Sequence, residues 1–169
     1  TLVRPHGAAR PRSALRVMAL RVRDCLIGLR HLYLRRVLKA DLHPSAKLSL
    51  KARIDFTNPR GVHIGAGTYV AFGATILSHD MSRLLHLDTY IGENCFIGAN
   101  SIIMPGIRVG HECIVGSGAV VTQDVPDHSI VVGNPAKVIR SNIRTREWGI
   151  LKEVYDARVA AESLRETTA

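Results

Sequence analysis

One histidine stands where a repeating pattern in the sequence breaks, in the segment Ser78-His79-Asp80. An imidazole titrates near neutral pH, which makes histidine the usual general base in enzymes. A carboxylate at Asp80 or Asp88 could orient the ring and hold the tautomer that accepts a proton. The position therefore makes His79 the candidate general base, with Asp80 beside it as the first candidate partner.

Metal binding is the competing chemistry for the same region. His79, His86 and His111 could form a three-histidine zinc site between the protomers of a trimer. The first two are seven residues apart across a loop, which is not a tight ligand spacing, and the three cysteines have no metal-ligand spacing either. We therefore expect no metal. The sequence also lacks a dinucleotide fingerprint, a P-loop and a G-x-S-x-G elbow.

A period of six residues organises the chain around His79. Six consecutive hexads open with an aliphatic residue, at Ile91, Ile97, Ile103, Val109, Val115 and Val121. The same register returns upstream from Ile64, Val70 and Ile76, with weaker copies at Leu48 and Ile54. A period of six fits neither an α-helix nor a simple strand, whereas three hexads make one triangular coil of a parallel β-helix. We expect each first position to point inward and to stack on its copy 18 residues later.

The repeat has two interruptions, and its hexads contain glycines and cysteines at regular positions. Asn58-Pro59-Arg60-Gly61 reads as a corner insertion, and residues 80–89 read as a loop that leaves the column. Insertions at corners often carry function. Glycines at the second hexad position, such as Gly92 and Gly98, are expected at tight corners. Cys95 and Cys113 are 18 residues apart and are expected to be small buried hydrophobes rather than a disulfide.

Composition bounds the class of protein. The chain has 169 residues, of which 46% are apolar, so we expect one folded domain with terminal extensions. No stretch is long and apolar enough for a membrane-spanning helix, and the odd number of cysteines fits a reducing cytoplasm. Residues 1–40 hold ten basic groups and one acidic group, whereas residues 41–169 hold thirteen of each. The main body therefore does not require a nucleic-acid partner.

Three segments are predicted: residues 1–44 as a basic amphipathic helical arm, residues 45–140 as the β-helix and residues 141–169 as a C-terminal helix that packs back on the body or on a neighbouring subunit. The arm carries a helical apolar stripe over residues 13–39. This stripe could cap the open end of the column, and the arginines off the stripe could be attracted to an anionic membrane surface. Both interpretations stay open at this point.

Residues 48–140 resemble the left-handed β-helix acyltransferases of the hexapeptide-repeat class. The run from Ile97 to Arg140 is similar to galactoside, maltose and serine acetyltransferases, and its GNPAKVIR ending is specific to that superfamily. The ILSHDMS segment more closely resembles acetyltransferases that act on bacterial exopolysaccharide precursors, such as the colanic acid type. The expected fold is therefore mainly β, a left-handed parallel β-helix with N-terminal and C-terminal helices.

The resemblance also implies a site. It implies a homotrimer with clefts between adjacent protomers, acetyl-CoA as co-substrate, His79 as the catalytic histidine, and Phe96 and Asp88 on the acceptor side. The positions implied to contact CoA are Gly98, Ala99, Ser117, Thr122, Gln123, Lys137 and Arg140. Many relatives have Lys at the position of Gln123, and the galactoside type has Pro at the position of Asp80.

The function expected from these observations is acetyl-CoA-dependent O-acetylation of a sugar or surface-polysaccharide precursor by direct transfer. His79 would take the proton of the acceptor hydroxyl, and backbone amides near Gly98-Ala99 would stabilise the oxyanion. N-acetylation of an amino sugar or an antibiotic stays open. The alternatives are a catalytically silent β-helix that serves in assembly or membrane docking and a trimeric zinc enzyme resembling carbonic anhydrase. We expect the protein in the cytoplasm, with peripheral contact at the inner face of the membrane through residues 13–39.

Overall fold

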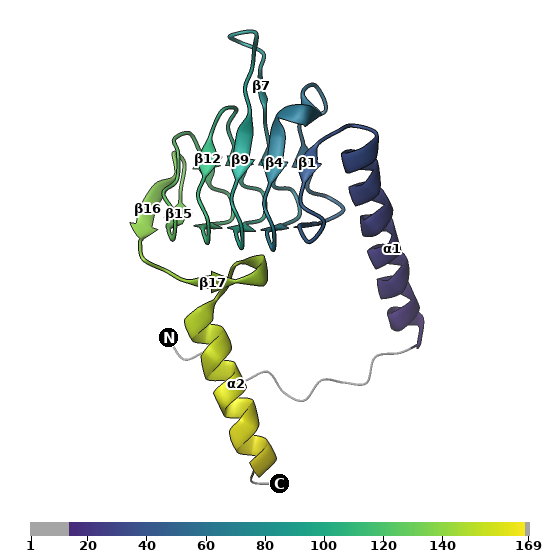
Figure 1. Cartoon of the computed structure of the whole chain (residues 1–169), viewed down its shortest axis with the longest axis vertical. Helices are drawn as coiled ribbons and strands as arrows, with labels where there is room; N and C mark the ends of the chain where they lie inside the picture. The colour runs from purple at the N-terminus through teal and green to yellow at the C-terminus, as the bar shows by residue number, and fades with distance from the viewer. Residues whose placement is uncertain (1–13, 168–169) are drawn as a thin grey trace.

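The computed structural model describes residues 14–167, which form a three-sided column of stacked coils with a helix at each end of the chain (Figure 1). Within this range no helix has the length and apolar content needed to cross a membrane. The column is the predicted left-handed parallel β-helix, and each of its sides is a narrow sheet whose strands are parallel except for the last strand of one side. We call the outer sides of these sheets face A, face B and face C, in the order in which each coil visits them.

Face A is formed by β1 (Asp41–Leu42), β4 (Val62–Ile64), β9 (Thr89–Ile91) and β12 (Arg108–Val109). Face B is formed by β2 (Lys47–Leu48), β5 (Tyr69–Val70), β10 (Phe96–Ile97), β13 (Ile114–Val115), β15 (Ile130–Val132) and β16 (Lys137–Arg140). Face C is formed by β3 (Arg53–Ile54), β6 (Thr75–Ile76), β11 (Ile102–Ile103) and β14 (Val120–Val121).

The hexad register sets the core as predicted. Ile91 pairs with Val109, and Ile97 pairs with Val115, one coil further along. These aliphatic side chains are at most 3% exposed and fill the narrow interior, where parallel coils stack about 4.8 Å apart. Cys95 and Cys113 are also fully buried and are free thiols. The spacing of inward aliphatic residues thus determines where each strand lies.

The glycines at the second hexad position have a different cause from the predicted one. A Cβ at Gly92 would lie 2.6 Å from the carbonyl oxygen of Gly110, so a side chain there would collide with the next coil. The left-handed backbone of the corner falls two residues later, at Asn94 and Asn100, with φ of 54° and 56°. Close approach of neighbouring coils, rather than backbone conformation, therefore requires Gly92.

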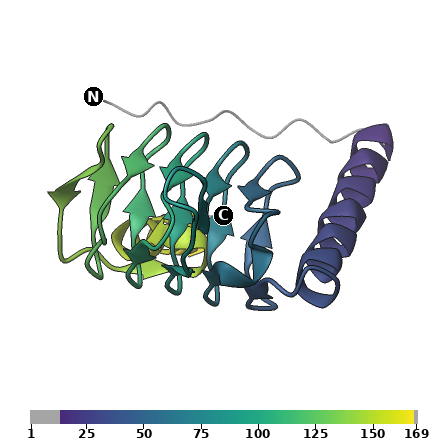
Figure 2. The same cartoon turned by 90° about the horizontal axis from the view of Figure 1, so that it is seen from above.

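The helix α1 (Ala14–Arg36) covers the N-terminal end of the column (Figure 2). Its Leu34 is 1% exposed and belongs to the core cluster. Arg30 reaches the edge of the first coil, where its Nη1 donates to the carbonyl oxygen of Ser49 at 2.9 Å and its Nη2 donates to that of Ala52 at 2.5 Å. Carbonyl groups at the end of a sheet have no partner strand. The Ser49 carbonyl accepts from the Ala52 amide at 2.9 Å, and Arg30 supplies it with a second donor and the Ala52 carbonyl with a side-chain donor.

Replacing Arg30 by Met should lower the free energy of unfolding by about 2 kcal/mol, because two charge-assisted hydrogen bonds to the coil edge are lost while the stem is kept. Urea unfolding of the whole chain measures the change. Arg23→Met is the matched control, since Arg23 lies on the same helix and pairs only with the exposed Asp24. Equal stability of the two variants would contradict the capping role.

The C-terminal end differs from the sequence prediction. The strand β16 folds back antiparallel on β15, and residues 145–151 then form β17 (Thr145–Arg146), a 3₁₀ turn η2 (Glu147–Gly149) and β18 (Ile150–Leu151) before α2 (Lys152–Thr167) begins. Left-handed backbone at Trp148 and Gly149 excludes a helix there. The helix α2 extends away from the column rather than back onto it, and its described side chains are exposed from residue 152 to residue 165 (Figure 1).

Candidate active site

His79 lies at the start of a two-stranded hairpin that projects from the column. The hairpin consists of β7 (His79–Asp80) and β8 (Leu85–His86), and it rises from the corner where the chain passes from face C to face A (Figure 1). The ring of His79 packs against that of His86, with centroids 5.1 Å apart and planes tilted by 60°. His79 is half-buried and His86 is exposed. The imidazole is therefore held in place at one side and open at the other.

The root of this hairpin is bound to the other corner insertion. Ser78 is fully buried, and its backbone amide donates to Asp55 Oδ2 at 3.1 Å. Its hydroxyl donates to the carbonyl oxygen of Asn58 at 2.5 Å, and Asn58 Nδ2 donates to the carbonyl oxygen of Ser78 at 3.0 Å. The short 3₁₀ turn η1 (Pro59–Gly61) follows. The insertion at residues 58–61 therefore acts as the support of the segment that carries His79.

Asp55 is the polar centre of this support. Its side chain is 9% exposed, and burial by itself would raise the pKa of its carboxyl. Hydrogen bonds from the backbone amides of Thr57, Ser78, Asn58 and His79 outweigh burial, so the pKa lies below its usual value. An ionised carboxylate at Asp55 thus joins the Thr57–Asn58 backbone to the Ser78–His79 side of the hairpin root, including the amide of His79 itself.

Asp80 does not serve as the predicted partner of His79. Successive side chains of a strand point to opposite sides, so a residue next to His79 in β7 is directed away from its ring. The Asp80 carboxylate accepts hydrogen bonds from Ser82 Oγ at 2.7 Å and from Arg83 Nε at 2.6 Å. These bonds, from Ser82 first and then Arg83, lower the pKa of Asp80 to about 2. Asp80 therefore stabilises the tip of the hairpin.

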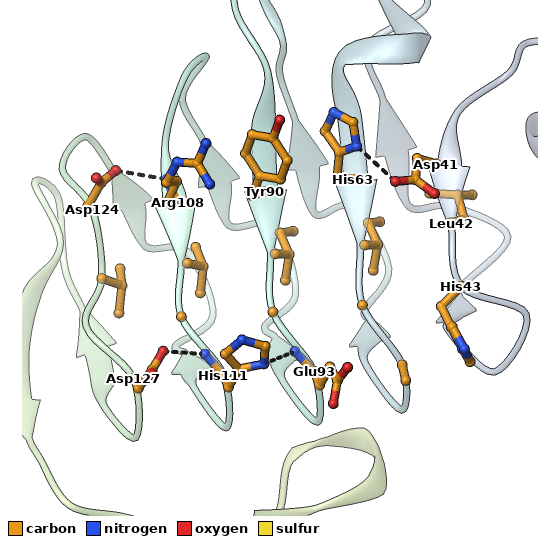
Figure 3. Close-up of a pocket in the computed structure, with 18 of the residues that line it drawn as sticks. Asp41, Leu42, His43, His63, Tyr90, Glu93, Arg108, His111, Asp124 and Asp127 are labelled. Atoms are coloured by element: carbon orange, nitrogen blue, oxygen red, sulfur yellow. Dashed lines mark hydrogen bonds and ion pairs between the residues drawn. The ribbon is translucent and has the colours of Figure 1, made fainter.

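A groove of about 1010 Å³ runs along face A below the hairpin (Figure 3). Its upper wall is a row of outward side chains from β4, β9 and β12. The rings of His63 and Tyr90 are stacked 4.2 Å apart and 8° from parallel, and the guanidinium carbon of Arg108 lies 4.0 Å from the Tyr90 centroid. His63 Nδ1 is 3.0 Å from Asp41 Oδ2. The groove wall is thus polar at its edges and rigid along its length.

Asp88 connects the hairpin to this row. It lies between β8 and β9, and its Oδ2 accepts a hydrogen bond from the Tyr90 hydroxyl at 3.4 Å. The same oxygen is 3.8 Å from His63 Nε2. Asp88 therefore contacts Tyr90 and His63 of the groove wall without lining the groove itself, and its predicted place on the acceptor side stays a prediction.

The lower rim of the groove is formed by corner residues of successive coils. His111 Nδ1 accepts from the backbone amide of Glu93 at 3.2 Å, and the His111 amide donates to Asp127 Oδ1 at 2.8 Å. Figure 3 shows His111 on the opposite side of the groove from His63 and Tyr90. His111 therefore does not join His79 and His86 in one cluster. Over residues 14–167, no group of three or more His, Cys, Asp and Glu side chains could hold a metal ion.

Five of the seven positions implied to contact CoA occupy two corners of the column. Gly98 and Ser117 meet at the corner between faces B and C, where a Cβ on Gly98 would lie 2.6 Å from the Ser117 amide nitrogen. Ala99 lies at the same corner, and its carbonyl oxygen accepts from the Gly118 amide at 2.8 Å. Thr122 and Gln123 are exposed and follow β14, at the corner between faces C and A from which the His79 hairpin rises. Within one protomer, these two groups of residues therefore lie at different corners of the column.

The remaining predicted positions lie on face B. Lys137 and Arg140 are exposed on β16, and Arg140 Nη2 contacts both carboxylate oxygens of Glu153 in α2, at 3.0 and 3.1 Å. The Phe96 ring is stacked on Tyr69 with centroids 5.9 Å apart, and a Cβ at Gly149 would collide with Phe96. The turn η2 therefore covers Phe96, which does not line the groove on face A.

Comparisons with known proteins agree with this architecture. Residues 89–123 match the family described as hexapeptide repeat of succinyl-transferase. The chain is 30% identical over 125 residues to YvoF of Bacillus subtilis (strain 168), whose name gives acetyltransferase as a provisional description; the match covers 72% of each chain. This chain belongs to the hexapeptide-repeat acetyltransferase family. It is accordingly an acyltransferase by family.

Other acetyltransferases are also similar to the chain in sequence or in structure. The chain is 43% identical over 84 residues to a 2,3,4,5-tetrahydropyridine-2,6-dicarboxylate N-acetyltransferase of Staphylococcus aureus, a match that covers 50% of this chain and 32% of that protein. Among solved structures, a maltose O-acetyltransferase from Clostridium difficile 630 superposes with a TM-score of 0.51 at 22% identity, covering 73% of this chain and 88% of that one. An acetyltransferase from Vibrio cholerae also gives 0.51, at 23% identity, covering 76% and 90%. These superpositions show the shared fold.

Two sets of residues in the site of this hexapeptide-repeat acetyltransferase escaped the sequence prediction. One is the support formed by Asp55 and Asn58, and the other is the row of His63, Tyr90 and Arg108. The row had a signal in the sequence, because each member directly precedes an inward aliphatic residue in register. The support had a weaker signal: both insertions follow strands of face C, and so share one corner.

Proposed function

We propose that this chain transfers the acetyl group of acetyl-CoA to a hydroxyl group of a hydroxyl-rich acceptor, a sugar or a surface-polysaccharide precursor. The observation that carries the proposal is the half-buried His79 on a hairpin whose root is fixed by Asp55 and Asn58. The groove of face A, which is lined with carboxylates and imidazoles but not by His79, lies below this hairpin. Such side chains accept and donate hydrogen bonds to hydroxyl groups. One of the similar folds, from Vibrio cholerae, was solved with acetyl-CoA bound to that protein.

The proposed reaction is a direct transfer. His79 removes the proton of the acceptor hydroxyl, and the oxygen attacks the thioester carbonyl carbon; the carbon–sulfur bond then breaks, and the CoA thiolate takes up the proton from the imidazolium. Three side chains that could have formed an acyl-enzyme are unsuited to it. Ser78 Oγ is bonded to the Asn58 carbonyl oxygen, and Cys95 and Cys113 are fully buried.

The hydrogen bonds between neighbouring coils limit which backbone amide could stabilise the oxyanion. The Gly98 amide donates to the Val115 carbonyl oxygen at 2.8 Å, so it is already used in the ladder between coils. Of the Gly98-Ala99 pair, this leaves the Ala99 amide as the proposed donor to the developing oxyanion. A preorganised donor of this kind contributes about 3 kcal/mol in other acyl transfers.

The distance between the corner that carries His79 and the corner where CoA is expected to bind supports a site shared between protomers. His79 rises from one corner of the column, whereas Gly98, Ala99 and Ser117 lie at another. A side-by-side homotrimer would bring the hairpin corner of one protomer against the CoA corner of the next. We include this homotrimer in the proposal, with each active site built from two chains.

Replacing Ser117 by Trp should weaken CoA binding by about tenfold or more, since a large side chain at an exposed corner position would occupy the space that the pantetheine arm needs. Isothermal titration with CoA measures the change. Lys51→Trp is the matched control, because Lys51 is exposed at the same corner three coils earlier. Wild-type protein that binds no CoA would contradict the transferase and favour a silent assembly module.

Mixed trimers test the shared site. Well below saturating acetyl-CoA, protomers carrying Ser117→Trp should be about tenfold and protomers carrying His79→Ala about a hundredfold less active than wild type. A random equal mixture should recover about one quarter of wild-type activity, the chance that neighbouring chains supply one intact half each. Thiol release from acetyl-CoA with a panel of sugar acceptors is the readout. A mixture no more active than its components would place the whole site within one chain.

A further inference from the structure

The helix α1 is apolar on two opposite faces. The face towards the column carries Leu20, Ile27 and Leu34, which are spaced by seven residues. Leu34 is buried there. Its outer face carries a second apolar row that no described residue covers, with exposed fractions between 46% and 72%: Leu15, Met18, Val22, Leu26, Leu29, Leu32 and Tyr33. Capping the column uses only the first of these faces, so the second requires another partner.

The charge around the outer row is strongly positive. Residues 14–39 contain seven basic residues and one acidic residue. The single acid, Asp24, is paired with Arg23 at 2.8 Å. A second copy of this helix would bring basic residues against basic residues with no acid left to pair them. Charge complementarity therefore favours an anionic partner over self-association.

The placement of α1 suits a flat partner. In both views the helix crosses the direction in which the coils stack, at the end of the column opposite β16 (Figures 1 and 2). Its outer row therefore faces away from the coils. In the side-by-side homotrimer proposed above, the three copies of α1 would lie at the same end of the assembly, where one flat surface could meet all three.

We propose that the outer face of α1 docks on an anionic lipid bilayer. An apolar row of this kind can sink into the boundary between headgroups and acyl chains, while flanking arginines such as Arg21 and Arg36 reach the lipid phosphates. The helix lies on the bilayer and does not cross it, consistent with its limited apolar length. The docking does not depend on acetyl transfer, and the site residues on faces A and B take no part in it.

Sedimentation of the whole chain with vesicles tests the docking. The protein should bind phosphatidylglycerol vesicles and leave phosphatidylcholine vesicles unbound. Val22→Glu with Leu29→Glu should weaken the binding by about tenfold or more, because two carboxylates would enter the apolar boundary. The matched control is Val154→Glu with Val159→Glu on α2, whose exposed valines lie among balanced charges and should have no effect.

A variant without two of the arginines measures the electrostatic contribution to vesicle binding separately from the apolar contribution. Arg21→Gln with Arg36→Gln should weaken binding to phosphatidylglycerol by about thirtyfold, at the contribution expected for two basic residues near an anionic surface. Circular dichroism confirms that each variant is folded. Equal binding to both vesicle types, or equal behaviour of the α1 and α2 glutamate pairs, would overturn the proposal. A lower assembly mass in light scattering for the α1 pair, with unchanged vesicle binding, would overturn it in favour of contact between copies.

Discussion

Replacing His79 by Ala is expected to lower turnover of acetyl-CoA with its acceptor by about a hundredfold or more, the usual contribution of a positioned general base. The hairpin keeps its root, because the hydrogen bonds of Asp55, Asn58 and Ser78 involve none of the His79 side-chain atoms. CoA affinity should stay close to that of the wild type, since Gly98 and Ser117 lie at a different corner. Thiol release at saturating acetyl-CoA measures the turnover.

His86→Ala is the matched control for this variant. It removes the ring that packs against His79 at 5.1 Å but leaves the base itself, so its effect on turnover should be much smaller. Unchanged turnover in His79→Ala would end the general-base proposal.

Replacing Asp55 by Ala should lower the free energy of unfolding by about 3 kcal/mol, because buried amide donors at the hairpin root lose their acceptor. Turnover should fall as well, since the His79 amide is one of those donors and the base would lose its fixed position. Asp55→Asn, which keeps one acceptor oxygen, should lie between the wild type and Asp55→Ala in both measurements. Urea unfolding and thiol release report the two effects.

Asp55 also predicts how stability depends on pH. The folded state lowers the pKa of this carboxyl, so its contribution is fully present above the unfolded value near 3.8. The contribution is lost as the pH falls through the lower, folded value. Asp55→Asn should remove this part of the acid sensitivity. If unfolding of the variant followed the same pH course as the wild type, the carboxylate would not be the support described here.

The repeat was predictable from sequence because its signal is local and repeated. Each inward Ile or Val follows the previous one after six residues, and the same rule gives both the strand and its partner one coil away. The corner insertions were visible as breaks in that rule. The position of His79 followed from the same breaks.

The partners of His79 were harder to predict because they depend on contacts distant in sequence. Asp80 is adjacent in the chain, yet strand alternation turns it towards Arg83. Asp55 is 23 residues before Ser78 and meets it only because both insertions share a corner. Likewise, Gly149 packs directly against Phe96, which is distant in the sequence. The local pattern of residues 145–151 therefore could not reveal the left-handed turn at Trp148 and Gly149.

The length of the groove on face A is set by the number of coils in the column. Its wall passes from Asp41 through His63, Tyr90 and Arg108 to Asp124, one residue from each rung of the column. Adjacent rungs are about 4.8 Å apart, so gaining or losing a single 18-residue turn would lengthen or shorten the trough by one such step while its chemistry stayed the same. Under the proposed function, preference for short or long acceptors would therefore change by duplication or deletion of whole turns, without any substitution at His79.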